Sequence, residues 1–225
     1  VVMKKIFLSG MFRSGTTTIA RLLNTHPDIA LTSDSFFPIL KFLRNKIYKS
    51  KFPYFNEVEP FSDKFLEHLE LNTIISDKLL NTSITKNEYN EIRNDICYKY
   101  NNNKPTHSQK ILQYVEKSNF KGNSIDVLNE LLKLNSELYS DKKLKYLGFK
   151  TVWQEEFITP LLKSNYFVFH SIRDPRAVIA SKLNNKEYGS NPILFLIRQW
   201  RKSVAYSIIN MKFKKYSLIK FEELI

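Results

Sequence analysis

The pattern of apolar and polar positions divides the chain into an N-terminal part, a middle block and a C-terminal part. Short apolar runs predict strands, and apolar residues spaced three and four apart predict helices. In the N-terminal part the pattern predicts a strand at 4–9, a helix at 16–24, a strand at 29–32 and a helix at 36–48. The first helix presents Ile19, Leu22 and Leu23 on one face, and it ends at His26 because the residue before a proline is pushed out of helical geometry.

The middle block, residues 51–143, consists of helical segments separated by polar stretches. Helices are predicted at 63–80, 86–100, 108–118 and 124–139. In the last of these, Ser124 is the expected N-cap. Its apolar face carries Ile125, Leu128, Leu131, Leu132 and Leu138. We expect this block to be a helical insertion that builds a wall of a substrate site.

The C-terminal part returns to strands that alternate with helices. Strands are predicted at 145–150, 166–172 and 216–221, and helices from 174 and over 192–210. Asp174 is the expected N-cap of the first of these helices, with Pro175 at its first position. The alternation predicts a single α/β domain over 1–225, with a mainly parallel sheet flanked by helices.

Composition excludes several classes of protein. The apolar fraction is 43% and the aromatic fraction 14%, which excludes a disordered chain. No apolar run approaches the ~18 residues of a membrane helix, so no membrane span is expected. The start lacks the apolar length and cleavage site of a signal peptide. Cys97, the single cysteine, excludes an intrachain disulfide, and we expect a cytoplasmic protein.

The net charge of +13 indicates either an anionic partner or simply a lysine-rich surface. Nucleic acid, a membrane surface, a nucleotide and an acidic glycan are the candidate anions. The lysines are scattered rather than gathered in a tail, so charge alone selects none of these.

A candidate anion-binding loop, residues 10–17, lies between the first predicted strand and helix. Its glycines let successive N–H groups and the helix N-terminus face an anion. The G-x-x-x-x-G spacing is that of a phosphate-binding loop, but Thr16 stands where an NTPase carries lysine, and the cation is Arg13 inside the loop. An ordinary glycine-containing turn is the alternative.

A second candidate site follows the strand at 166–172. Arg173 leaves the strand end, and Ser181 lies eight residues later on the next predicted helix. A guanidinium and a hydroxyl so placed can converge on one anion. The alternative is that Arg173 pairs with a local carboxylate and Ser181 has no ligand.

These two segments together resemble the sulfotransferase family. Residues 12–17, followed by Leu22-Leu23 and His26-Pro27-Asp28, resemble its 5′-phosphosulfate loop, and residues 173–181 resemble its 3′-phosphate motif. The resemblance covers 3–45 and 144–225, and hardly touches the block between them. The cytosolic branch carries lysine at the position of Arg13 and tryptophan at that of Thr18, so this chain is closer to the Golgi-type and bacterial protein- or carbohydrate-modifying branches.

The resemblance implies a P-loop-like fold and the donor 3′-phosphoadenosine 5′-phosphosulfate (PAPS). Arg13 would face the sulfuryl group, and Arg173 and Ser181 would bind the 3′-phosphate. The residues implied around the 5′-phosphate are Ser14, Gly15, Thr16, Thr17 and Thr18. Residues 217–224 resemble a strand and turn that relatives follow with further helices, which implies that such helices are missing from these 225 residues.

Two further residues are candidates for catalysis. Asp34 follows the strand at 29–32, and relatives with a carboxylate base carry glutamate about here, so the resemblance implies a general base. Asp34 could instead cap the next helix. Lys150 resembles the family lysine that stabilises the bridging oxygen, although Val152 replaces the usual proline. A solvated lysine at a strand end is the alternative reading of Lys150.

No metal is expected. A sulfuryl group carries less negative charge than a phosphoryl group, so side-chain cations can suffice. The four histidines show no metal-binding spacing; they are His26, His68, His107 and His170. His26 fits a structural turn, and His107 is an alternative base.

The sequence therefore predicts a PAPS-dependent sulfotransferase. Its acceptor would be a hydroxyl or amine of a glycan, peptide or small molecule. A P-loop kinase-like phosphotransferase and a non-catalytic polyanion-binding protein are the alternatives. No nucleic-acid partner is expected, and the oligomeric state stays open.

Overall fold

The computed structural model describes residues 3–34, 37–51, 78, 82–103, 113, 115–118, 122–139, 141–184 and 192–224. Almost all of the helix predicted at 63–80 and most of the one predicted at 108–118 fall outside these residues. His68 and His107 fall outside them too.

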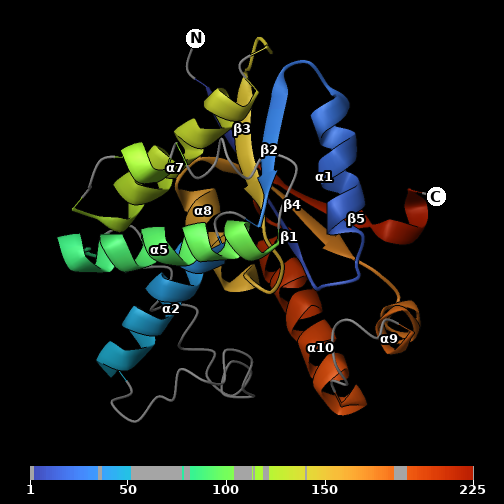
Figure 1. The fold of residues 1–225 in the computed structure, drawn as a ribbon. Coiled ribbons are helices and arrows are strands. Elements are labelled where there is room, and N and C mark those ends of the chain that lie inside the picture. Colours follow the sequence, from blue (N-terminus) through green and yellow to red (C-terminus); the bar gives the residue numbers. More distant parts are fainter. Residues whose placement is uncertain are drawn as a thin grey trace.

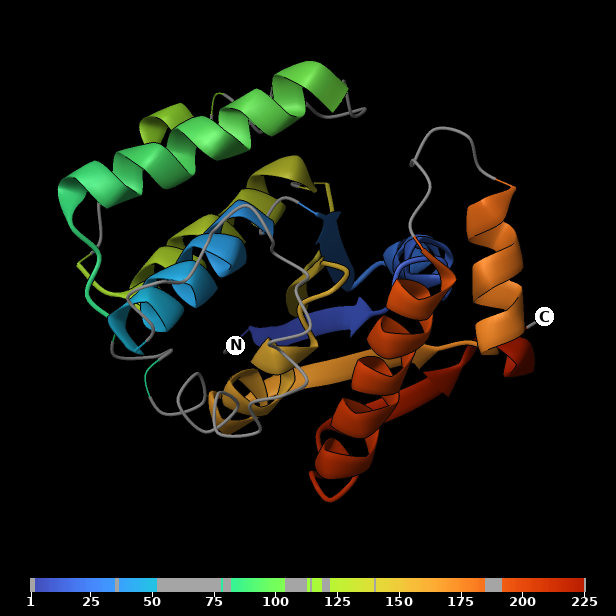
Figure 2. The same cartoon turned by 90° about the horizontal axis from the view of Figure 1, so that it is seen from below.

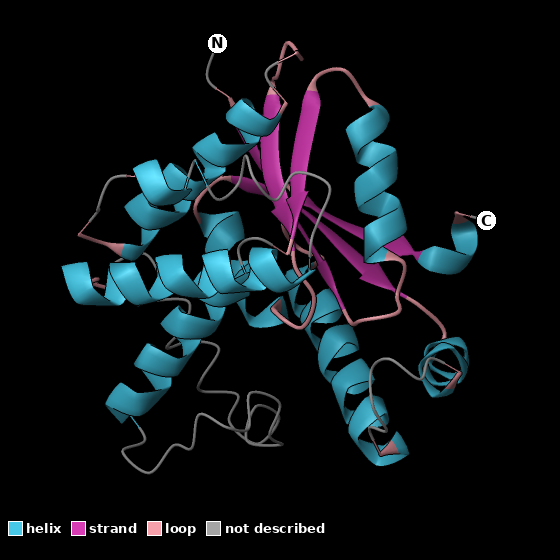
Figure 3. Ribbon diagram, viewed as in Figure 1, coloured by secondary structure: helices cyan, strands magenta, loops and turns pink. Residues whose placement is uncertain are grey.

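A five-stranded parallel sheet forms the centre of the fold (Figures 1 and 3). Across the sheet the strands are β2 (Ile29–Ser33), β3 (Tyr146–Lys150), β1 (Lys4–Gly10), β4 (Tyr166–Ile172) and β5 (Tyr216–Lys220). β1 lies in the middle, where Phe7 is aligned with Phe149 of β3 and Val168 of β4. The predicted α/β fold with a mainly parallel sheet is confirmed.

Helices cover both faces of this sheet, because alternate strand residues point to opposite faces. On one face, Ile6 and Leu8 pack with Ile19 and Ala20 of α1 (Thr16–Thr25). On the other face, Phe7 belongs to a larger core. The helices that contribute to it are α2 (Phe37–Lys51), α5 (Lys86–Asn103), α7 (Ser124–Leu138), α8 (Ile158–Lys163) and α10 (Ile193–Asn210). Figure 1 shows α1 on one side of the sheet and α2, α5 and α7 on the other.

The remaining helices lie at the carboxyl ends of the strands. α9 (Pro175–Leu183) follows β4 directly, and its Val178 packs with Met11 of the loop after β1 and Leu196 of α10. Two short 3-10 turns, η2 (Glu155–Phe157) and η4 (Phe221–Glu223), follow β3 and β5. None of the described helices is both long and apolar enough to cross a membrane.

Two details of the predicted helices are wrong. Leu22 is 56% exposed, so the buried face of α1 turns toward Ala20, which is 1% exposed. Asn123, not Ser124, is the N-cap of α7: its side-chain oxygen accepts a hydrogen bond from the Asp126 N–H at 2.9 Å. Asn123 caps as well as Ser124 would, and it leaves Ser124 buried in the first turn.

Candidate active site

The loop after β1 forms a tight turn that ends at the N-terminus of α1. The Ser14 N–H donates to the Met11 carbonyl at 3.2 Å, and the Ser14 hydroxyl donates to the same oxygen. The chain then enters α1 at Thr16, whose side chain is buried, whereas Thr17 and Thr18 are exposed. No described side chain caps α1. The N–H groups of its first turn therefore remain for an anion.

Gly15 is required at the end of this loop for two reasons. Its φ is 83°, in the left-handed region that favours glycine. A Cβ at this position would also lie 2.0 Å from the ring of Phe221 in η4. The same Phe221 ring lies 4.8 Å from the guanidinium carbon of Arg173. Phe221 thus holds the loop and Arg173 together, and no spacing in the sequence could have singled it out.

The two predicted anion-binding segments meet. Arg13 Nε donates to Ser181 Oγ at 2.9 Å, and Arg173 Nη1 donates to the Arg13 carbonyl at 3.1 Å. The Ser171 hydroxyl at the end of β4 donates to the Ser14 carbonyl at 2.5 Å. Arg173 Nε is buried and has no hydrogen-bond partner among the described residues. Two guanidinium groups, one hydroxyl and one helix N-terminus are therefore gathered at the carboxyl ends of β1 and β4.

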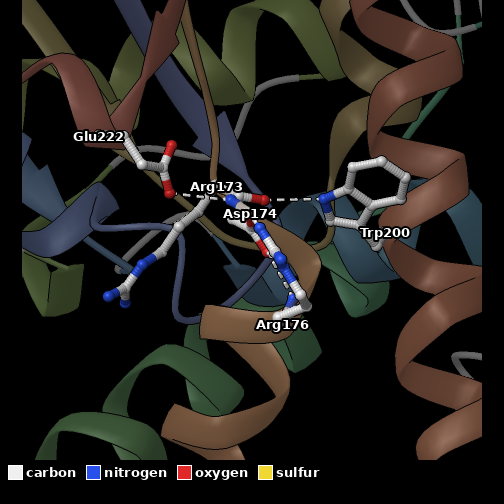
Figure 4. A network of polar contacts seen from close by, with 5 residues as sticks. All are labelled: Arg173, Asp174, Arg176, Trp200 and Glu222. Carbon is white, nitrogen blue, oxygen red and sulfur yellow. Dashed lines mark hydrogen bonds and ion pairs between the residues drawn. The ribbon is translucent and has the colours of Figure 1, made fainter.

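The turn between β4 and α9 aims Arg173 at this loop (Figure 4). The nearby carboxylate, Asp174, is held by Arg176 at 2.6 Å rather than by Arg173. Hydrogen bonds from the side chain and the backbone N–H of Arg176 lower the pKa of Asp174 to about 2. The Asp174 N–H donates to Glu222 at 2.9 Å, and Trp200 Nε1 donates to the Arg173 carbonyl at 2.8 Å. In Figure 4 the Arg173 guanidinium points away from Asp174, which does not fit the local-carboxylate alternative.

Asp34 and Lys150 form an ion pair at the ends of neighbouring strands. Lys150 Nζ donates to Asp34 Oδ2 at 2.7 Å, and the Asp34 N–H donates to the Lys150 carbonyl at 2.6 Å. The Lys150 side chain is 4% exposed and that of Asp34 is 33% exposed, so the carboxylate is the solvent-facing partner. The residues were predicted separately; their pairing follows from β3 lying beside β2, which the sequence did not reveal.

The segment after β3 connects this pair to the loop after β1. The Thr151 N–H donates to the Leu8 carbonyl at 3.0 Å, and the Trp153 N–H donates to the Gly10 carbonyl at 3.2 Å. The Trp153 ring packs edge-on against Phe12, with 4.7 Å between ring centroids. Lys150 therefore lies one strand away from the loop, in the crevice that parallel sheets form at their carboxyl ends.

Lys182 is a second cation near Arg13 that the sequence analysis missed. It follows Ser181 on α9, is 5% exposed, and its Nζ lies 5.3 Å from the centre of the Phe12 ring. Burial and the charge of Arg13 lower the pKa of Lys182. Arg13 and Lys182 therefore both add positive charge beside the loop after β1. A helical lysine gives no sequence signal of this role, because its position depends on how α9 packs.

A buried charged cluster lies beyond the segment after β3. Lys202 of α10 binds Glu156 at 2.8 Å and Glu155 at 3.5 Å, and Arg44 of α2 binds Glu156 at 3.4 Å. Burial raises the pKa of Glu155. Burial acts on Glu156 too, but the charges of Lys202 and Arg44 outweigh it and lower the pKa of Glu156. The cluster joins α2, η2 and α10, and no pattern in the sequence indicates it.

A cavity of about 440 Å³ opens between α2 and α5. α2 contributes lysines and α5 contributes carboxylates to its walls. The lining residues are Pro38, Lys41, Phe42, Asn45, Lys46, Lys49, Glu88, Glu91, Ile92 and Asp95. Lys46 binds Glu88 at 2.7 Å, whereas Asn45 Oδ1 is buried without a hydrogen-bond partner among the described residues. Pro38, at the start of α2, lines the cavity and is four residues from Asp34 in the chain.

The described histidines have structural partners. His170 is fully buried between Tyr216 and Ser203, with contacts of 2.8 and 2.9 Å. Burial and the charge of Lys202 lower the pKa of His170 to about 3, so the ring is neutral. His26 Nδ1 accepts the Asp28 N–H at 3.1 Å within its turn. Across the described part of the chain, no group of three or more His, Cys, Asp or Glu side chains could hold a metal ion.

Comparison with known proteins gives a family match, and it also finds distant similarity to solved structures. Residues 5–133, more than half of the chain, match a family model described as "Sulfotransferase family". The match includes the loop and Asp34, extends through much of the middle block, and ends before Arg173 and Ser181. The crystal structure of TT1252 from Thermus thermophilus is similar at 11% identity and a TM-score of 0.41, over 98% of this chain and 89% of that one. No curated protein matches significantly.

Proposed function

Because the chain belongs to the sulfotransferase family, we propose that it transfers a sulfuryl group from PAPS to a hydroxyl or amine of a glycan, peptide or small molecule. Sulfuryl transfer is the activity of the family; the donor and the acceptor class are the proposal. The observation that carries it is the convergence of Arg13, Ser181 and Arg173 beside the uncapped N-terminus of α1. PAPS carries two separate phosphates, so its binding needs two groups of hydrogen-bond donors. The N-terminus of α1 is one of these groups, and Arg173 with Ser181 is the other.

The residues present fit this donor. The N–H groups of α1 and the threonines from Thr16 to Thr18 would hold the 5′-phosphate, as the helix N-terminus favours an anion. Arg173 and Ser181 would hold the 3′-phosphate, and the buried, unpartnered Arg173 Nε supports a missing anionic partner. When bound, PAPS supplies the sulfuryl group. Arg13 and Lys182 place positive charge beside it.

Asp34 and Lys150 have complementary roles in the proposed reaction. Asp34 takes the proton from the acceptor hydroxyl or amine as a general base. Lys150 keeps this carboxylate in place through the 2.7 Å contact and adds positive charge at the same edge of the sheet. Arg13, Lys150 and Lys182 would stabilise the charge that develops on the leaving oxygen.

The acceptor would bind along α2. We propose that the middle block, residues 51–143, is a helical insertion within a single domain and forms the acceptor wall. The cavity between α2 and α5 supports this, because it starts next to Asp34 in the chain and offers the unpartnered Asn45 oxygen to a hydroxyl or amine. Its size suits a polar molecule of about one or two sugar rings.

The test is transfer from radiolabelled PAPS to a panel of glycans, peptides and small hydroxyl or amine compounds, with and without EDTA. We expect label on at least one acceptor class, with EDTA making no difference. Transfer from labelled ATP that EDTA abolishes and Mg²⁺ restores would instead favour the kinase-like alternative.

A further inference from the structure

The outward face of α10 is apolar, contrary to the usual polar outer face of a surface helix. Leu194 is 72% exposed, Ile208 is 66% exposed and Ile197 is 37% exposed. At 100° per residue, the exposed positions of α10 fall within an arc of about 160°. They include Ile193, Leu194, Ile197, Arg198, Arg201, Ile208 and Ile209. We call these seven residues the α10 face.

The opposite side of the helix explains why the α10 face is turned outward. Lys202, Tyr206 and Asn210 are buried on that side, where α10 contacts β4, η2 and α8. The helix is therefore fixed in rotation by its polar contacts, and its apolar residues cannot turn inward. In Figure 1, α10 extends past the lower edge of the sheet, and Figure 2 shows the same helix from below.

The charge of this region has one sign. Between Glu187 and Glu222 the sequence contains no acidic residue and seven basic ones. These are Arg198, Arg201, Lys202, Lys212, Lys214, Lys215 and Lys220. Arg201 is exposed at the middle of the α10 face, and Lys212 and Lys214 are exposed just beyond its end. The α10 face therefore combines apolar side chains with cations and carries no carboxylate.

We propose that the α10 face binds the surface of an anionic lipid membrane. A helix in the plane of such a surface buries its apolar side chains at the level of the acyl chains, and Arg201 reaches the phosphates. A second copy of the chain is a poor partner, since a two-fold contact would bring Arg201 against cations with no carboxylate to pair with. A soluble polyanion would match the cations but leave Leu194, Ile197 and Ile208 exposed.

Vesicle co-sedimentation tests this proposal independently of sulfuryl transfer. The probes are vesicles of phosphatidylcholine alone and of phosphatidylcholine with an equal part of phosphatidylglycerol. We expect binding to the mixed vesicles only, weakened by salt. Arg201→Gln should lower the partition coefficient about fivefold, since each basic residue near such a surface contributes ~1 kcal/mol. The pair Ile197→Ser and Ile208→Ser should lower it at least as much with the charge unchanged.

The matched control is Arg21→Gln with Leu22→Ser on α1, which removes one exposed cation and one exposed leucine elsewhere. This control should bind the mixed vesicles as the unmutated chain does. Circular dichroism verifies that each variant is folded. The proposal is overturned if no vesicle binds, if the control loses as much binding as the α10 variants, or if heparin binds and vesicles do not. A dimer that dissociates in the α10 variants, without vesicle binding, would also overturn it.

Discussion

Removing the Arg173 side chain should abolish most of the preference for a nucleotide with a 3′-phosphate. Arg173 is fixed by its bond to the Arg13 carbonyl at 3.1 Å and by the Phe221 ring at 4.8 Å from its guanidinium carbon. Its buried Nε has no described partner, so one guanidinium N–H is available to a ligand. We therefore expect Arg173→Ala to weaken adenosine 3′,5′-bisphosphate and to leave AMP nearly unaffected.

The magnitude follows from one charge-assisted hydrogen bond, which contributes about 1.5 to 3 kcal/mol. Since 1.4 kcal/mol is tenfold, Arg173→Ala should weaken the bisphosphate by roughly 10- to 100-fold. Ser181→Ala removes one hydrogen bond from a hydroxyl to the same charged phosphate, also about 1.5 to 3 kcal/mol, and should weaken the bisphosphate by a similar factor. The measurement is calorimetric titration of both nucleotides at one salt concentration, because these charges are screened.

Arg176→Ala is the matched control for this experiment. Arg176 lies on the same turn, three residues from Arg173, but its side chain is 90% exposed and binds Asp174. Arg176→Ala keeps the hydrogen bond from the backbone N–H of residue 176 to Asp174, so the turn is preserved. The affinities for the bisphosphate and for AMP should therefore both be unchanged. Equal affinity of the unmutated protein for the bisphosphate and AMP would refute the assignment of Arg173 and Ser181 to a 3′-phosphate. So would an equal loss in both arginine variants.

Three further predictions concern chemistry, loop geometry and pH. Asp34→Asn should lower kcat by roughly 10² to 10⁴-fold and leave the bisphosphate affinity unchanged. Asp28→Asn is the control: Asp28 is also paired with a lysine, and its substitution should leave kcat intact. Normal turnover in Asp34→Asn would exclude Asp34 as the base. Gly15→Ala should weaken bisphosphate binding, because the new methyl group would lie 2.0 Å from the Phe221 ring. Adding Phe221→Ala removes this clash and should recover part of the lost affinity. If nothing is recovered, the loss comes from the backbone conformation of residue 15 and not from the clash. The pKa of His170 is about 3 in the folded state and 6.5 in the unfolded state. Below pH 6.5 the unfolded chain therefore binds more protons than the folded chain, so the free energy of unfolding decreases as the pH is lowered. From pH 7 to 5 this costs about 2 kcal/mol of unfolding free energy in urea titrations, and His170→Gln should lack that part of the decline; an identical decline in both proteins would contradict it.

Those parts of the site that follow from strand order alone could be predicted. Residues 10–17 and Arg173 each follow an apolar strand, and carboxyl ends of parallel strands share one edge, so strand order places the two segments at the same edge. The family resemblance, not strand order, implied that both bind one donor. The Asp34–Lys150 pair was not, because β3 enters the sheet between β2 and β1 only after the whole middle block. Sequence spacing does not reveal which distant strand becomes a neighbour.

Contacts that depend on side-chain packing were beyond the sequence. Phe221 lies against Gly15 although the two are far apart in the chain, and the direction of Lys182 depends on how α9 meets Phe12. The error at Leu22 has the same origin. Leucine at helical spacing indicates an apolar face, but among the apolar residues of α1 the sheet face that it covers fully buries only Ile19 and Ala20. Hydrophobic spacing sets the helix, and the packing partner decides which residues are covered.

The buried charged cluster has a consequence for catalysis. Glu156 forms ion pairs with Arg44 of α2 and Lys202 of α10. α2 begins just after Asp34, and Trp200 of α10 donates a hydrogen bond to the Arg173 carbonyl. Removing one partner of such a cluster leaves an uncompensated buried charge, at a cost of about 3 to 5 kcal/mol. α2 and α10 therefore cannot shift independently of the segment after β3. One cluster therefore connects the helix after the proposed general base, Asp34, with the helix that holds Arg173, the proposed 3′-phosphate residue, and the proposed transfer, which requires two reactants in line, would depend on that fixed relation.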